Sequence, residues 1–202
     1  MPKVLDVTSI MGKMSKFTST IVSLMSTEYV ILVDEQDREL GVMEKLQAHT
    51  EAKLHRAVSV FVFNLKQELL LQKRAATKYH SVGLWTNTCC SHPKPAEETI
   101  HAAKRRLQEE MGIDCEMEYA FNFTYLAKLE NNLSEHEFDH VFLGFSNAVP
   151  KPNPIEVAEY KYMSLDEIGN QLKQKPETFT AWFALIFDRV KNELTKHKNN
   201  IL

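Results

Sequence analysis

The stretch EETIHAAKRRLQEEMG, residues 97–112, carries the clearest structural signal in the chain. Its apolar residues recur at helical spacing, at Ile100, Ala103, Leu107 and Met111. Gly112 follows at the position where a glycine commonly ends a helix. We therefore predict a helix over residues 97–111 that buries one stripe of side chains.

Three charged residues of this helix face different directions. At about 100° per residue, Glu110 lies on the margin of the buried stripe and Glu109 points to the opposite side. Arg106, one turn earlier, shares the margin and can pair with Glu110 or bind an anion. The alternative to a functional site is a solvated helix surface with ordinary charge pairs. Taken alone, Arg106, Glu109 and Glu110 favour this alternative.

Strand patterns surround the helix in the sequence. Residues 57–64 are apolar on both faces, as expected for a central buried strand, and residues 28–34 begin a hairpin. Further strands are predicted at residues 69–72, 116–128, 136–145 and 159–163. Ser164, with Glu167 three residues later, can cap a short helix, and Thr180 can cap a longer one. The order of these elements predicts an α+β fold.

Composition excludes several classes of protein. The 202 residues carry a formal net charge of -3, which provides no overall basic field for nucleic acid or anionic lipid. The longest mainly apolar runs, residues 57–63 and 181–187, are far shorter than the ~20 residues of a membrane span. Cys89 and Cys90 are adjacent and suit a disulfide framework poorly, so we expect a reducing, cytoplasmic setting.

The first 24 residues differ from the rest of the chain. Serine and threonine are scattered there among Lys3, Lys13 and Lys16, without clean apolar periodicity. We predict a tail over residues 1–24 that is disordered; a targeting presequence and a dispensable upstream start are the other interpretations. Residues 25–202 are long enough for one domain.

The segment WTNTCCSHP, residues 85–93, places a thiol near an imidazole. If the segment is extended, alternation puts Cys90 and His92 on one face and Cys89 on the other. Such a pair can bind a metal, act as nucleophile and base, or transfer a proton. Two small buried residues with a hydrogen-bonded histidine would give the same pattern.

The segment SEHEFDH, residues 134–140, contains two carboxylates that share a strand face. Glu135 and Glu137 would lie about 6.6 Å apart along the strand, with His136 facing away. Two buried carboxylates on one face need a cation or a shared proton, whereas a solvated acidic edge needs neither. Together with His49, His55 and His92, they would form a ligand set suited to Zn²⁺ or Mn²⁺.

These motifs, in this order, resemble the type I isopentenyl-diphosphate isomerases of the Nudix superfamily. The resemblance rests on Glu44-Lys45, His49 and His55, then Trp85-Thr86-Asn87 and Cys90-Ser91-His92-Pro93, then Arg105-Arg106-Leu107 with Glu109 to Gly112, then Glu135-His136-Glu137. The Nudix box reads G-x5-E-x7-R-E-U-x-E-E-x-G-U. Ser91 stands at its first glycine and Arg106 at its second acid, which disfavours hydrolase chemistry.

The resemblance implies a Nudix-like mixed β-sheet layered between α-helices, with residues 25–202 as a single catalytic domain. It implies interconversion of isopentenyl and dimethylallyl diphosphate, through a tertiary carbocation, in isoprenoid biosynthesis. The expected partner is a small-molecule diphosphate, without nucleic acid or membrane. The expected state is a cytoplasmic monomer or weak homodimer.

The resemblance also assigns roles to individual residues. The expected catalytic residues are Cys90, Glu137, Tyr125 and Trp182, the last as an aromatic shield for the cation. One divalent metal, Mn²⁺ or Zn²⁺, is expected on His49, His55, His92, Glu135 and Glu137. A second ion, Mg²⁺, is expected on Glu110 and the backbone carbonyl of Cys90. The diphosphate is expected on Lys45, Arg74, Lys78 and Arg106, all at the end of the pocket opposite Trp182.

Two other functions fit parts of the same pattern. A Nudix diphosphohydrolase would bind Mg²⁺ with Glu97, Glu109 and Glu110 and attack phosphorus with water, leaving Cys90 and Glu137 without a role. A non-catalytic binding module would need the basic pocket alone and would be indifferent to Cys90→Ala.

Overall fold

Strand β3, His55–Phe63, runs through the middle of a mixed sheet in the computed structural model, which describes residues 27–199. Its residues from Ala57 onward are buried on both faces, as the apolar pattern predicted. It pairs in parallel with β8, Ser134–Phe145, and antiparallel with β6, Cys89–Ser91. The parallel register sets His55 opposite Glu137.

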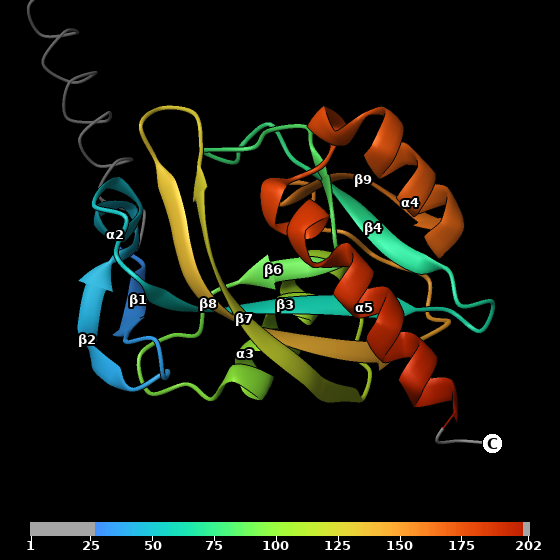
Figure 1. Ribbon diagram of the computed structural model, residues 1–202, viewed down its shortest axis with the longest axis horizontal. Coiled ribbons are helices and arrows are strands. Elements are labelled where there is room, and N and C mark those ends of the chain that lie inside the picture. Colours follow the sequence, from blue (N-terminus) through green and yellow to red (C-terminus); the bar gives the residue numbers. More distant parts are fainter. Residues whose placement is uncertain (1–26, 200–202) are drawn as a thin grey trace, which may run out of the picture.

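The other strands extend this sheet in both directions (Figure 1). On one side lies the predicted hairpin of β1, Tyr29–Val33, and β2, Glu39–Glu44. On another, β4, Leu69–Arg74, pairs with β5, Trp85–Thr86, and with β9, Val157–Met163. Strand β7, Met117–Lys128, pairs along β8.

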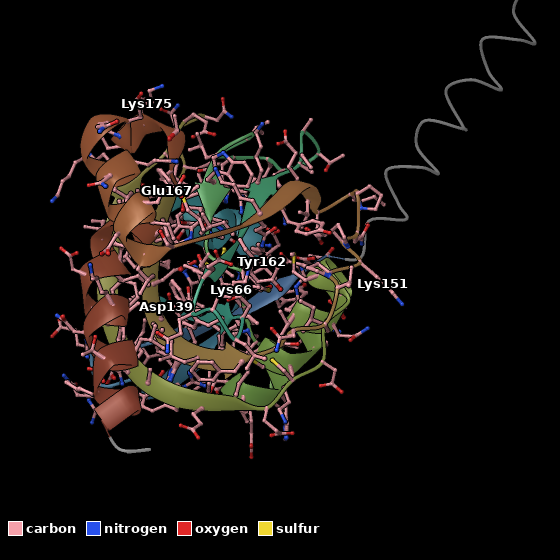
Figure 2. All side chains as sticks on the ribbon, turned by 90° about the vertical axis from the view of Figure 1, so that its right-hand side faces the viewer. Lys66, Asp139, Lys151, Tyr162, Glu167 and Lys175 are labelled. Atoms are coloured by element: carbon pink, nitrogen blue, oxygen red, sulfur yellow. The ribbon has the colours of Figure 1, made fainter. Side chains whose placement is uncertain are left out.

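Helices cover both faces of the sheet. Helix α3, Thr99–Met111, packs on one face through Ala103, Leu107 and Met111. Helices α4, Leu165–Gln174, and α5, Ala181–Asn199, cover the other face, with the 3₁₀ turn Pro176–Thr178 between them. In Figure 2, Lys175 lies in the layer of these two helices and Lys151 on the opposite side, beside α3. The predicted α+β fold, a mixed sheet layered between helices, is confirmed.

The helix ends follow local chemistry. Gly112 ends α3 in the left-handed region, at φ 63°, and the Ser164 hydroxyl accepts from the Glu167 amide, both as predicted. Thr180 stands directly before α5, where the sequence placed it, and its hydroxyl donates to Thr86 of β5 at 2.9 Å.

The structure also contains a helix that the sequence pattern did not reveal. Helix α2, Lys45–Thr50, is only six residues long, and its side chains show no usable periodicity. The Glu44 carboxylate begins it by accepting from the amides of Leu46 and Gln47. The turn of α2 carries His49 into the interior.

No helix among residues 27–199 has the length and apolar character needed to cross a membrane. The predicted tail, residues 1–24, lies outside the described residues. The cytoplasmic setting, the oligomeric state and the boundaries of the catalytic domain stay predictions.

Candidate functional site

One pocket gathers most of the predicted site residues from across the fold. It opens among α2, β4, β6, β7, β8 and the start of α5. The predicted residues that line it are Lys45, Arg74, Lys78, Cys90, His92, Arg106, Tyr125, Glu135, Glu137 and Trp182. Tyr79, His80 and Ser91 line it as well.

Four of the predicted metal ligands converge beside this pocket. One ligand atom each from His49, His55, His92 and Glu137 lies within 4.8 Å of all the others. His49 and His55 each place Nδ1 next to a backbone carbonyl, that of Lys45 at 2.7 Å and that of Lys53 at 2.8 Å. These bonds fix the ring orientations and direct both Nε2 atoms at the cluster.

Two imidazoles of this cluster, those of His49 and His92, are in the neutral state that a metal requires. Burial, and then the charge of the neighbouring His55, lower the pKa of His49 to about 4. Burial likewise lowers the pKa of His92 to about 3, despite its hydrogen bond to Glu137. His49 Nε2 is buried and has no hydrogen-bond partner among residues 27–199. Three converging imidazole nitrogens beside one carboxylate therefore fit a divalent cation.

Glu135 lies just outside this group of four. The Tyr125 hydroxyl bridges the two carboxylates, at 2.7 Å from Glu137 and 3.0 Å from Glu135. Glu135 also lies 3.4 Å from His80 Nε2. The two glutamates share a strand face, as the alternation predicted, while His136 turns away to the Ala52 carbonyl.

The two carboxylates differ in proton affinity. Burial, and then the charge of Glu137, raise the pKa of Glu135 well above its usual value. Burial acts to raise the pKa of Glu137 too, but hydrogen bonds and charge from His55 and His92 hold it well below the usual value. Of the two carboxylates, Glu135 therefore holds a proton more readily than Glu137.

The adjacent cysteines occupy opposite faces of β6. Cys90 lines the pocket and packs against the core beneath α5, whereas Cys89 is buried in the core beneath α3. This confirms the predicted face assignment, although a break at Asn87 and Thr88 divides the segment into β5 and β6. Burial raises the pKa of the Cys90 thiol to about 12. Cys90 is thus a protonated thiol at neutral pH.

Carboxylates hold three of the four predicted diphosphate-binding cations. Lys45 pairs with Glu28 at 2.8 Å, and Arg106 lies 2.6 Å from Glu110 and 3.0 Å from Glu156. Lys78 also pairs with Glu156. The cations are therefore preset in position by acidic partners.

Arg74 corrects one expectation about the layout of the pocket. Its guanidinium lies 5.4 Å from the centre of the Trp182 ring, and it donates to the His80 carbonyl at 3.1 Å. The basic residues therefore do not all lie at the end opposite Trp182. The reason is the strand pairing: β4 lies next to β5, which hydrogen-bonds to the start of α5 through Thr180.

Sequence reasoning did not identify His80 and Glu156 as part of this region. His80 contacts Glu135 and lies edge-on to Trp182, with ring centres 6.1 Å apart. It follows the predicted Lys78 closely, and a histidine next to a basic site residue was a signal that could have been used. Glu156 follows a proline-rich loop whose path has no periodic pattern.

Comparison with known proteins gives the class first. The family model of the NUDIX domain matches residues 53–183, so the chain belongs to the NUDIX family. The crystal structure of DR0079 from Deinococcus radiodurans has the same fold, with a TM-score of 0.68 and 19% sequence identity. That match covers 80% of this chain and 98% of the other.

Closer relatives define the branch of the family. "Isopentenyl-diphosphate Delta-isomerase" from Pectobacterium atrosepticum is 55% identical over 80% of this chain and 90% of its own length. "Isopentenyl-diphosphate Delta-isomerase 2" from Aromatoleum aromaticum is 52% identical over 81% of this chain and 86% of its own length. Within the NUDIX family, the chain belongs with the isopentenyl-diphosphate Delta-isomerases.

Proposed function

We propose that this protein interconverts isopentenyl and dimethylallyl diphosphate. The observation that carries the proposal is the placement of Cys90, with the hydrogen-bonded pair Tyr125–Glu137, around one pocket beside the histidine cluster. The relatives named as isomerases support it. The reaction would serve isoprenoid biosynthesis.

The reaction moves one proton onto the substrate and takes another away. Protonation of the terminal CH₂ of isopentenyl diphosphate gives a tertiary carbocation, and loss of a proton from the carbon nearer the diphosphate gives the product. We assign these transfers to Cys90 and Glu137, with Tyr125 assisting through its 2.7 Å bond to Glu137. The raised pKa of Cys90 suits a neutral thiol that can donate a proton.

The cation must be kept from water and from nucleophiles. Trp182 is 2% exposed and lines the pocket, so its ring can cover the reacting carbons. An aromatic face also stabilises a nearby positive charge. The cation–π geometry of Arg74 on Trp182 means that this ring already faces a cation.

We propose two cation sites. His49, His55, His92 and Glu137, with Glu135 beside them, would hold Mn²⁺ or Zn²⁺. Glu110 and the Cys90 carbonyl would hold Mg²⁺, with the diphosphate on Lys45, Arg74, Lys78 and Arg106. Bound there, the ions would supply Lewis acidity and charge neutralisation.

The arginines of α3 argue against hydrolysis. Glu97 accepts two bonds from Arg105, both at 2.7 Å, and Glu109 accepts from Arg106 at 2.7 Å. All three carboxylates that a hydrolase would use for Mg²⁺ are thus engaged by arginine, because Glu110 also accepts from Arg106, at 2.6 Å. Glu110 differs from the other two in being fully buried, beneath Arg106, which lines the pocket.

Isomerisation is directly measurable. We expect purified protein supplied with Mg²⁺ and either Mn²⁺ or Zn²⁺ to convert isopentenyl diphosphate to an equilibrium mixture with dimethylallyl diphosphate. ¹H NMR spectra recorded over time measure this conversion. In D₂O, deuterium should enter the substrate pool, because protonation draws on exchangeable groups. Phosphate release from a nucleoside diphosphate without isomerisation would instead establish a hydrolase, and tight diphosphate binding without turnover a binding module.

Kinetic parameters should separate the two ends of the pocket. We expect Lys78→Ala to raise KM roughly 10-fold with little change in kcat, because it removes a charge that binds the diphosphate. Trp182→Ala should chiefly lower kcat by admitting water. Arg74→Ala should affect both, because Arg74 contacts the Trp182 ring. Normal turnover by Trp182→Ala would make Trp182 a packing residue.

A further inference from the structure

Gln72 carries a buried side-chain amide and is not among the proposed catalytic, metal-binding or substrate-binding residues. It lies on β4 and is 2% exposed. Its Nε2 donates to Glu110 Oε2 at 2.9 Å and to the Thr88 carbonyl at 3.0 Å. Both amide hydrogens are therefore used, one on helix α3 and one on the backbone just before β6.

The Glu110 carboxylate is fixed from several directions. It is 1% exposed, and its Oε1 accepts from Arg106 at 2.6 Å while Oε2 accepts from Gln72. Burial, and then the charge of the neighbouring Glu110, raise the pKa of the Cys89 thiol well above its usual value. With a donor on each oxygen, the carboxylate cannot rotate freely, and each oxygen retains a lone pair for a cation.

The second bond of Gln72 fixes the other half of the proposed Mg²⁺ site. Thr88 stands two residues before Cys90, whose carbonyl is the proposed partner of Glu110. The Thr88 hydroxyl itself donates to the Leu70 carbonyl at 2.6 Å and accepts from the Val62 amide at 2.9 Å. One amide thus joins a rigid strand segment to a carboxylate on a helix.

The remaining atom of this amide indicates a ligand. Gln72 Oε1 is buried and has no hydrogen-bond partner among residues 27–199. A buried acceptor without a partner destabilises the folded protein, so such an oxygen is normally satisfied by a ligand or a water. It shares one carbon with the nitrogen that holds Glu110, and Mg²⁺ characteristically keeps several of its waters. A water on such an ion would satisfy this oxygen.

We propose that Gln72 is a positioning residue for Mg²⁺: it holds Glu110 and the segment leading to Cys90 at a fixed separation and accepts from a water on the ion. This inference rests on the proposed function only through the assignment of Mg²⁺ to Glu110. Magnesium binding can therefore test it without turnover.

The test uses Gln72→Met, which keeps side-chain length and removes both polar atoms. Protein carrying one equivalent of Zn²⁺ is titrated with inorganic pyrophosphate at a series of Mg²⁺ concentrations in a calorimeter. We expect the half-saturating Mg²⁺ concentration to rise roughly 10- to 100-fold. Gln72→Asn keeps an amide but is too short to span Thr88 and Glu110, so we expect the same direction and a protein that folds more readily.

Two further variants make the result decisive. Thr86→Val removes a buried hydroxyl directly opposite Gln72 in the β4–β5 pair, so it controls for loss of stability and should leave the Mg²⁺ dependence unchanged. Glu110→Gln should abolish that dependence. Wild-type Mg²⁺ dependence in both Gln72 variants would overturn the role of Gln72, and an unchanged Glu110→Gln would overturn the magnesium assignment with it. If the variants show the expected differences in Mg²⁺ dependence but the parent protein does not isomerise isopentenyl diphosphate, the proposed function alone is refuted.

Discussion

Cys90→Ala and Glu137→Gln are each expected to lower kcat for isomerisation by about 10²- to 10⁴-fold, the range that positioned acids and bases contribute. Cys90 lines the pocket, and Glu137 lies 2.7 Å from the Tyr125 hydroxyl, so each substitution removes a group that can exchange a proton there. Initial rates of product formation measure the loss. Circular dichroism should show an intact fold, because neither side chain is a large part of the core.

The other cysteines provide matched controls for this result. Cys89 neighbours Cys90 in sequence but lies in the core beneath α3, next to Glu110. We expect Cys89→Ala to reduce activity only several-fold and to act through the Mg²⁺ dependence. Cys115 is absent from the pocket lining, and Cys115→Ala should be as active as the parent protein. Equal losses from Cys89→Ala and Cys90→Ala would contradict the assignment of the proton-transfer role to one face of β6.

His92→Ala is expected to lose the tightly bound transition metal. His92 Nε2 lies 2.8 Å from Glu137 Oε1 and 3.1 Å from His55 Nε2, so it stands between two other members of the cluster. Removing it takes away a ligand, and metal affinity should fall by more than the roughly 10- to 100-fold typical of residues that merely orient ligands. Metal per protein chain, measured by mass spectrometry after desalting, reports the loss.

Neighbouring histidine and glutamate residues test whether this loss is specific. His136 stands between Glu135 and Glu137 in sequence but contacts the Ala52 carbonyl on the other face, so His136→Ala should retain metal. Glu135→Gln should weaken binding less than His92→Ala, since Glu135 lies outside the group of four. Full metal content in both His92→Ala and Glu135→Gln would show that the ion is held elsewhere.

Local periodicity predicted a large part of the fold. The helix over residues 97–111 was placed by its apolar stripe and by Gly112, and the structure has it at Thr99–Met111. Its start differs because Glu97 holds Arg105 and the Lys94 amide before the first turn. The short helix α2 escaped prediction because six residues provide less than two turns of pattern.

The same reasoning predicted side-chain directions at the site. Alternation along a strand separated Cys90 from Cys89 and set Glu135 and Glu137 on the face opposite His136. Helical spacing distinguished the buried Glu110 from the exposed Glu109. These predictions succeeded because the direction of a side chain relative to its own element depends on backbone geometry alone.

Local patterns in the sequence therefore predict most of the helices and strands, and the faces on which Cys90, Glu110 and the two site glutamates lie. Which faces meet depends on tertiary packing: the parallel register of β3 and β8 brings His55 to Glu137, and the packing of α3 on the sheet brings Glu110 to Gln72. Tertiary packing also places Arg74 on Trp182, contrary to the expected layout. Such distances depend on strand register and on the fit of buried side chains between layers, which no local spacing encodes.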